Sequence, residues 1–353
     1  MRTFKKRQVV CVVGVLVWAV WLSALGVSRG AEVISENWPF PFAVIFGSVV
    51  AGASSVGGGA VAFPVFTKWL SVLPQDAKVF SLAIQSVGMG AATLAIVFGR
   101  VRVDWRVIRW ASAGGVGGVL IGTVLLSPHM IPPVVKMSFT MMMASFAFTL
   151  WVLNRGHREC HDALPEFSTR ERGLLFLAGL VGGMMSGLVG NGVDIVVFSM
   201  MVLLFRVSEK VATPTSVVLM ALNAMVGFAI VGPGLSQFTP EIREWWLASI
   251  PVVVWGAPLG VVLCTLMSRV AVARLLIGLI AVELVSSLIL IPLTTKVVSI
   301  SLVVGLLFGG VCFDGPCPEI CSVAGAGEDS PAKRAGGREA SFYTEGVADF
   351  GCD

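Results

Sequence analysis

Residues 52–64 read Gly-Ala-Ser-Ser-Val-Gly-Gly-Gly-Ala-Val-Ala-Phe-Pro and interrupt a long apolar run that extends from about 41 to 70. A weaker copy, Gly-Leu-Val-Gly-Asn-Gly-Val-Asp-Ile-Val-Val-Phe-Ser, stands at 187–199 inside the apolar run 173–205. Glycine and proline in the middle of an apolar run weaken a helix. Inside a bilayer, the backbone groups freed by such a break are tolerated only in protein or around a water-filled cavity. The two stretches therefore predict two broken helices that line one internal binding site.

The composition is typical of a polytopic membrane protein. Of the 353 residues, 56% are hydrophobic and 13% are charged, whereas about a quarter of a soluble domain is charged. Three cysteines crowd into residues 312–321, but their spacing is a weak metal signal. The chain contains no G-x-x-x-x-G-K-[ST] motif, no nucleophile elbow and no histidine cluster. We therefore predict a non-enzymatic, all-α integral membrane protein with no cofactor, metal or nucleic-acid partner, most simply in an inner or plasma membrane.

The apolar runs and the polar segments between them predict six parts. They are a signal anchor or cleavable signal peptide with a polar linker at 1–37, a first transmembrane repeat at 38–153, a cytoplasmic loop at 154–172, a second transmembrane repeat at 173–292, a last transmembrane helix at 293–313 and a disordered tail at 314–353. Glycines that recur every fourth residue at 114, 118 and 122 predict a helix face that another helix approaches closely. Trp105, Trp110, Trp245 and Trp246 are most simply interpreted as an interfacial belt.

The two halves are similar in sequence. A shift of 135 positions matches residues 43–81 with 178–216, and the matches include Gly47/Gly182, Gly52/Gly187, Gly57/Gly192, Phe63/Phe198, Ala77/Ala212 and Ser81/Ser216. A shift of 138 matches Gly118/Gly256, Gly122/Gly260 and Lys136/Arg274. Apolar composition alone would produce several of these pairs, so the glycines and the serine carry the interpretation. We interpret the pattern as a duplication, with chance similarity between apolar helices as the alternative.

Charge predicts how the halves are oriented, because positive residues favour the cytoplasmic side of short loops. The basic loops lie at 2–7, 100–109, 155–172, 206–210 and 269–274, whereas loop 232–244 is net acidic. All basic loops fall inside if each glycine-broken segment enters and returns as a helical hairpin, or crosses as two short helices. Each repeat then makes an odd number of net crossings, so the second repeat is inverted relative to the first. Inverted repeats are the design of many secondary carriers.

The glycine stretches and the residues after them resemble the two signatures of the sulfite exporter TauE/SafE family of membrane permeases. The first signature is matched by Gly52, Ser55, Gly57, Gly58, Gly59, Pro64, Ala77, Ser81 and Gln85, and the second by Gly187, Gly190, Asn191, Gly192, Lys210, Ala212, Thr213, Asn223 and Ala224. The resemblance covers about 40–312. It implies a carrier of small sulfur-containing or carboxylate anions that works without ATP. Val193 and Asp194 depart from the pattern, because they stand where two glycines would mirror Gly58 and Gly59.

An anion carried through a bilayer needs hydrogen-bond donors away from bulk water. Glycines at half-helix N-termini leave free backbone N–H groups and let the anion approach closely. Hydroxyl and amide side chains nearby add donors. The candidate substrate-binding residues are Ser54, Ser55, Gly57, Gly58, Gly59, Ser81, Gln85, Gly190, Asn191, Gly192, Thr213, Ser216 and Asn223. For the serines and threonine, a hydroxyl bond to the carbonyl one turn earlier is the structural alternative.

Four ionisable residues in or near the apolar segments have candidate roles. Asp194 is predicted to bind and release a proton coupled to transport, because an ionisable group in a membrane segment is a functional hypothesis by default. The alternative is a structural carboxylate that caps a neighbouring half-helix. Glu283 is a second such acid and a weaker candidate, since it could simply face Lys136 or Arg274. Lys136 and Arg274 could form anion-attracting vestibules, with interface anchoring as the alternative.

Together these features predict a secondary-active carrier of sulfite or an organosulfonate that works by alternating access. The expected partners are the small anion, the lipid bilayer and a coupling proton or cation, and a homo-oligomer remains open. A passive anion channel and a carboxylate carrier are the alternatives, followed by a sensor or assembly factor that uses the same fold.

The inverted arrangement predicts the sidedness of two loops. A tag inserted at Gly234 should be accessible from outside intact cells, and a tag at Gly156 only after permeabilisation, because the first loop is acidic and the second is basic. Labelling both tags with a membrane-impermeant reagent measures this. Both tags on one side would contradict the inverted repeat.

Overall fold

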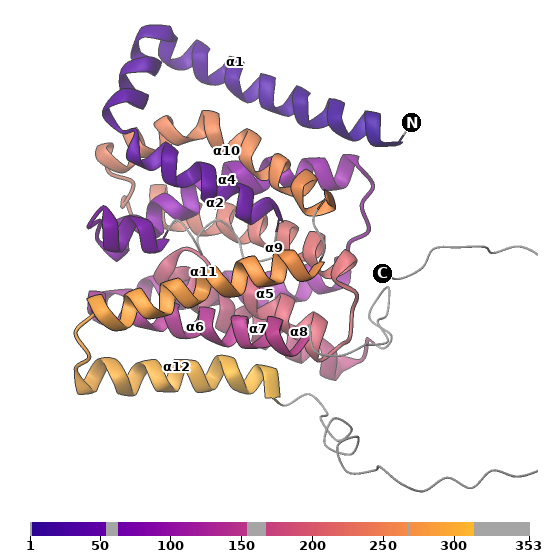
Figure 1. Ribbon diagram of the computed structural model, residues 1–353, viewed down its shortest axis with the longest axis vertical. Helices are drawn as coiled ribbons and strands as arrows, with labels where there is room; N and C mark the ends of the chain where they lie inside the picture. The colour runs from indigo at the N-terminus through magenta and orange to yellow at the C-terminus, as the bar shows by residue number, and fades with distance from the viewer. Residues whose placement is uncertain (1, 54–62, 154–166, 267–268, 314–353) are drawn as a thin grey trace, which may run out of the picture. The chain divides into compact units, whose positions relative to one another are not determined.

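The computed structural model describes residues 2–53, 63–153, 167–266 and 269–313. Every element in these ranges is a helix (Figure 1). The first half contains α1 (Arg2–Glu36), α2 (Pro39–Ala53), the short π-helix η1 (Val65–Trp69), α4 (Pro74–Phe98), α5 (Trp105–Leu120) with its continuations η2 (Ile121–Leu126) and η3 (Ser127–His129), and α6 (Pro132–Leu153). The second half contains α7 (Thr169–Val189), α8 (Val193–Leu203), α9 (Glu209–Ala229) with η4 (Ile230–Gly234), α10 (Pro240–Leu266), α11 (Arg269–Leu290) and α12 (Thr295–Phe313).

Six helices within the described residues are long and apolar enough to cross a membrane. They span Cys11–Glu36, Pro74–Phe98, Trp105–His129, Pro132–Trp151, Thr169–Val189 and Glu209–Gly234. The apolar parts of α2, α8 and α12 are shorter. These helices confirm the predicted all-α class. The break predicted in the first glycine stretch and the tail after 313 lie outside the described residues, whereas the second stretch is divided between α7 and α8.

Two helices extend beyond their expected limits. α7 begins at Thr169, before the apolar run, because Ser168 and Glu171 form a capping box: the Ser168 hydroxyl accepts from the N–H of Arg170, and Glu171 accepts from the N–H of Ser168. α1 continues to Glu36 through a kink at Gly26, where φ is +72°. The segment expected to be a polar linker is therefore helical from 29 to 36.

The glycines of α5 form a face that lies directly against the backbone of α7. A Cβ atom at Gly114, Gly118 or Gly122 would lie 2.0–2.3 Å from a carbonyl oxygen of α7. Glycines on α7, at 179, 183 and 187, meet α5 in the same way. The close approach predicted for residues 114–122 is thus confirmed. The sequence did not indicate that the helix packed against this face is α7.

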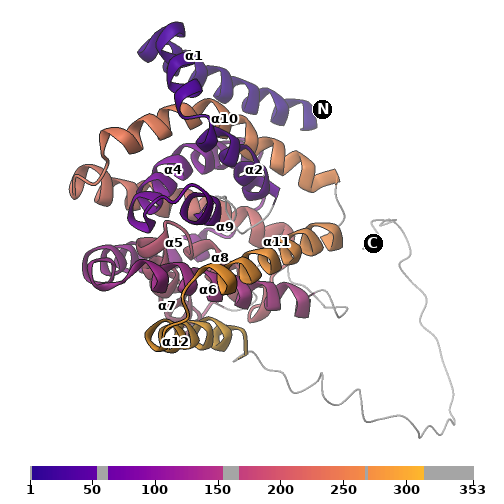
Figure 2. The same cartoon turned by 60° about the vertical axis from the view of Figure 1, so that its left-hand side comes forward.

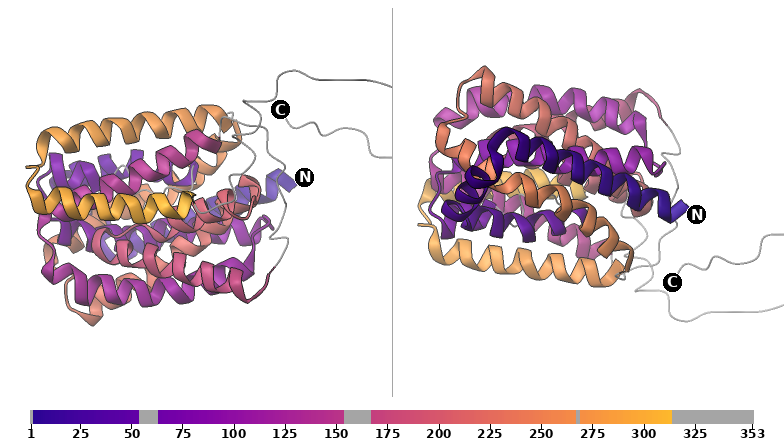
Figure 3. Two further views of the ribbon diagram at one scale, coloured as in Figure 1. Left: turned by 90° about the horizontal axis from the view of Figure 1, so that it is seen from below. Right: turned by 90° about the horizontal axis from the view of Figure 1, so that it is seen from above.

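Several contacts pair a helix of one half with a helix of the other. α5 packs against α7, α2 against α10, and α4 against α9. The approach of α2 to α10 also uses a glycine, because a Cβ at Gly256 would collide with the side chain of Ser48. α1 lies along α10 on one side of the bundle, and α12 lies beside α6 on the opposite side (Figures 1 and 2). The views from below and from above show these two outer helices in front of the rest (Figure 3).

The contact between α1 and α10 supplies a hydrogen-bond donor to a backbone carbonyl of α10 that has none within its own helix. Pro251 lies inside α10 and has no N–H, so the carbonyl of Leu247 one turn earlier loses its helical donor. The indole Nε1 of Trp21 donates to that carbonyl at 2.8 Å, and Nε1 of Trp18 donates to the carbonyl of Pro251 at 3.0 Å. The N-terminal helix therefore satisfies a backbone group of the bundle that lipid cannot satisfy.

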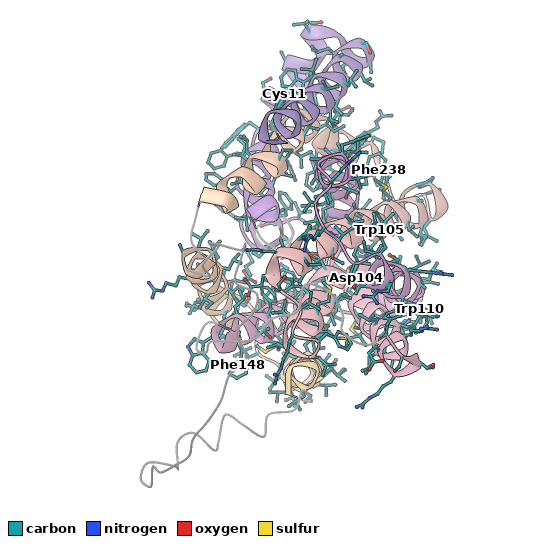
Figure 4. The ribbon with its side chains drawn as sticks, turned by 90° about the vertical axis from the view of Figure 1, so that its right-hand side faces the viewer. Cys11, Asp104, Trp105, Trp110, Phe148 and Phe238 are labelled. Atoms are coloured by element: carbon teal, nitrogen blue, oxygen red, sulfur yellow. The ribbon has the colours of Figure 1, made fainter. Side chains whose placement is uncertain are left out.

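The tryptophans do not all behave as a belt. Trp105 is exposed next to the buried Asp104 that caps α5 (Figure 4). Trp245 is buried and stacks on Phe40 with 4.3 Å between ring centroids. Trp246 donates from Nε1 to the carbonyl of Ala83 on α4 at 3.0 Å. The interfacial interpretation is thus wrong for these last two, because their rings pack between helices.

Replacing Gly118 with alanine should destabilise the bundle. The new methyl group would lie 2.2 Å from the carbonyl oxygen of Leu180 and 2.8 Å from the Cα of Gly183, so we expect a loss of about 1–3 kcal/mol from overpacking. Melting of the detergent-purified variant measures the effect.

Gly117→Ala is the matched control. A Cβ there meets only the Leu180 side chain at 3.6 Å, and alanine favours a helix over glycine by up to about 1 kcal/mol. Equal melting temperatures for the two variants would contradict the assigned helix contact.

Candidate functional site

The break between α7 and α8 is fixed by two glycines with left-handed backbone angles. Gly190 has a φ of +90° and Gly192 a φ of +155°. A Cβ at Gly190 would lie 2.8 Å from Cβ of Ser81 and 2.9 Å from the carbonyl oxygen of Lys78, both on α4. Glycine is therefore required at 190 for conformation and for space. The turn between the two helices lies directly on α4.

A small polar pocket lies at this break. It has an empty volume of about 160 Å³ and is lined by Gln85 of α4, by Ser186, Gly190, Asn191, Val193 and Asp194 of the α7–α8 region, and by Met220, Asn223 and Ala224 of α9. The space is too narrow for a water molecule in this conformation. Five candidate residues from three separate parts of the chain, namely Gln85, Gly190, Asn191, Asp194 and Asn223, thus meet at one place.

Side chains satisfy the backbone groups that the break exposes. The amide nitrogen of Gln85 donates to the carbonyl of Gly190 at 3.2 Å and to the Ser81 hydroxyl at 2.5 Å. The N–H of Val193, at the first position of α8, donates to the Ser186 hydroxyl at 3.2 Å. The pocket is therefore held together by the residue types that could also bind a polar ligand.

Two acceptor groups at the pocket lack hydrogen bonds among the described residues. Both carboxylate oxygens of Asp194 and the side-chain oxygen of Asn223 are buried without a hydrogen-bond partner. Backbone N–H groups of the first turn of α8 face Asp194, but none meets hydrogen-bond geometry. Asp194 is 1% exposed. An unpartnered carboxylate in such a place is unfavourable unless a proton or a cation joins it.

The other candidates lie elsewhere or outside the described residues. Ser216 donates to the carbonyl of Thr213 at 2.8 Å, which is the local bond given above as the structural alternative, and neither residue lines the pocket. Arg274 is exposed on α11, whereas the ammonium of Lys136 donates to the carbonyl of Thr67 at 2.7 Å. The matching positions 136 and 274 thus differ in environment. Ser54, Ser55 and Gly57–Gly59 lie outside the residues that the structure describes.

A second polar group, here called the Lys68 cluster, joins three other segments. It consists of Lys68 on η1, Thr140 on α6, and Glu283, Ser286 and Ser287 on α11. Nζ of Lys68 lies 2.7 Å from Oε2 of Glu283 and donates to the two serine hydroxyls at 2.9 and 2.7 Å. The hydroxyls of Thr140 and Ser287 lie 3.0 and 3.1 Å from Oε1 of Glu283. Both charged side chains are more than nine-tenths buried.

Sequence reasoning missed two lysines. Lys68 stood unremarked inside the first apolar run, although a lysine and a glutamate in apolar segments are a signal that each needs the other. Glu283 therefore faces neither of the cations considered for it, Lys136 and Arg274, as its ion-pair partner. Lys78 is absent from the candidates above, yet the structure places it at 1% exposure inside the bundle.

A comparison of the sequence with models of protein families found one family. Residues 40–289 match the family model described as sulfite exporter TauE/SafE. The chain belongs to this family. Comparisons with curated proteins and with solved structures found no match.

The matched residues extend from the start of α2 almost to the end of α11 and contain both the pocket and the Lys68 cluster. The exporter family and the six apolar helices place the protein in the cell membrane as an integral, multi-pass protein. As a TauE/SafE member it belongs to a family of membrane transporters.

The Lys68–Glu283 pair should behave as a coupled unit. Glu283→Gln leaves a buried ammonium without its counter-charge, and Lys68→Met leaves a buried carboxylate, so each single change should cost about 3–5 kcal/mol. The double variant should lose less than the sum of the two. Melting temperatures of the four proteins in detergent give the coupling.

Arg29→Gln is the control for this cycle. It removes the pair with Glu32, in which both side chains are about half exposed, and a second pair with Glu244 of α10, whose side chain is 27% exposed. Both pairs are accessible to solvent, so the melting temperature should change little. Additive losses at Lys68 and Glu283 would show that the two residues are not coupled.

Proposed function

We propose that the protein is a secondary-active carrier of small sulfur-containing anions, such as sulfite or an organosulfonate, that works by alternating access. The observation that carries the proposal is the buried polar pocket at the α7–α8 break, because it combines amide side chains, a helix start and an ionisable group within an apolar bundle. Broken helices at internal sites are the recurrent binding geometry of secondary carriers.

Recognition of the anion would use the start of α8 and the amides around it. The N-terminus of a helix carries free N–H groups and a partial positive charge that favour anions. The amides of Gln85, Asn191 and Asn223 lie around this end of α8 and supply further N–H donors.

Alternating access is supported by the closed state of the pocket. Because the space does not admit a water molecule here, a substrate can enter or leave only when the lining helices move apart. The pairing of α5 with α7, α2 with α10 and α4 with α9 joins the two halves throughout the bundle. The pocket lies among helices of both halves, as a site between two repeats that rock against each other would.

Asp194 is proposed as the group that couples transport to a proton or cation gradient. Its two oxygens lack hydrogen bonds within the described structure, and its negative charge would repel an anionic substrate in the same pocket. Uptake of a proton removes that repulsion, so the two events favour each other. The anion gradient itself is the alternative source of energy.

Transport by the purified protein in liposomes tests the proposal. We expect saturable uptake of radiolabelled sulfite or a sulfonate that rises with a pH gradient, measured beside sulfate and a small carboxylate. Flux without saturation or trans-stimulation would identify a passive anion channel, and saturable uptake of only the carboxylate would identify a carboxylate carrier.

Asp194→Asn should lose the response to the pH gradient, because an amide cannot take up the proton. Uptake driven by the anion gradient should persist. Glu36→Gln, at an exposed position on α1, is the control and should keep the wild-type response. An unchanged pH response in Asp194→Asn would reject the coupling role and leave the carrier proposal intact.

A further inference from the structure

Lys78 is a buried lysine that forms no close ion pair with any of the described residues. It lies in the second turn of α4, its residue is 1% exposed, and its ammonium makes one hydrogen bond, to the hydroxyl of Ser127 at 3.3 Å. Asp76, two residues earlier, acts on it only through space and forms no ion pair with it. Within the part of the chain that the structure describes, no carboxylate lies within ion-pair distance of Lys78, and Asp76 acts on it from farther away.

The Lys68 cluster shows what this bundle provides for a buried ammonium. Lys68 has a carboxylate at 2.7 Å, two serine hydroxyls and a backbone carbonyl. Lys78 has a single, long hydrogen bond. A buried charge is strongly unfavourable unless it is paired and hydrogen-bonded. The ammonium of Lys78 therefore has fewer hydrogen bonds in this conformation than a buried ammonium needs.

Lys78 shares a helix face with the pocket. Lys78, Ser81 and Gln85 stand at positions i, i+3 and i+7 of α4 and so lie on one side of the helix. The turn at Gly190 covers this face, because a Cβ at Gly190 would touch both the Lys78 carbonyl and Ser81, and Gln85 donates to the Gly190 carbonyl. Seven residues span about 10 Å of helix, so the lysine begins about two turns from the pocket.

The ionisable residues near this turn, Asp194 and Lys78, carry opposite charges, and only that of Lys78 is complementary to an anion. Asp194 is the ionisable residue among those that line the pocket, and it is an acid, so the pocket offers an anion no positive side chain. We propose that Lys78, with the hydroxyl of Ser127, binds the oxygens of the carried anion and supplies its counter-charge within the bundle. This inference rests on the proposed function and assigns the residue that selects for negative charge.

A purely structural role for Lys78 makes a different prediction. Its ammonium could serve only to offset the negative carbonyl end of α7, and replacing it with an apolar side chain would then destabilise the ligand-free protein. If Lys78 instead binds the carried anion, its positive charge has no close counter-charge in the ligand-free protein. Methionine of similar length should then leave the ligand-free protein as stable or make it more stable.

A matched pair of ligands and variants tests the proposal on the full chain in detergent. Methanesulfonate carries the charge, and dimethyl sulfone is its neutral counterpart. We expect the wild type to bind methanesulfonate and to discriminate against dimethyl sulfone. Lys78→Met should weaken methanesulfonate binding by about tenfold or more and should melt, without ligand, at the wild-type temperature or above. Lys78→Arg keeps the charge and should retain most of the binding.

Lys296→Met, at an exposed position on α12, is the control and should match the wild type in binding and in melting. Wild-type affinity in Lys78→Met, or a lower melting temperature of that variant without ligand, would overturn the inference while the proposed function stands. A wild-type protein that binds none of sulfite, methanesulfonate and a small carboxylate would overturn the proposed function and this inference with it.

Discussion

The structure depends on one constraint: a backbone polar group inside a bilayer must find its partner within the protein. The chain breaks a helix at Gly190–Gly192, and the groups exposed there are satisfied by Ser186 from the same helix and by Gln85 from α4. This requirement holds α4 against the break. It also explains why the amide and hydroxyl side chains gather at one place in a protein that is otherwise apolar.

Much of the fold could be predicted from the sequence because it follows from local patterns. Apolar runs gave the helices, and the four-residue spacing of glycines on α5 gave a face for close approach. The partner of that face and the burial of Trp245 could not be predicted, since both depend on which helices meet in three dimensions. The capping box that starts α7 was visible in the sequence as Ser168 and Glu171 and would have corrected its boundary.

Part of the candidate site could also be predicted from local sequence patterns. Glycine breaks with amides at matching distances indicated Gln85, Asn191, Asp194 and Asn223, which the structure brings together. The lysines were missed because the sequence does not show whether a cation near the end of a helix points outward or inward. Lys68 and Lys78 both point inward, and only the structure shows that one has a carboxylate and the other does not.

The hydrogen bond from the Trp21 indole to the Leu247 carbonyl crosses the boundary of the residues that match the family. Residues 40–289 carry the family match, yet α10 within them has a proline gap whose hydrogen-bond donor comes from α1. A polypeptide trimmed to the matched residues would present an open carbonyl to lipid or detergent. The family match therefore stops short of α1, although α1 supplies a hydrogen-bond donor to α10.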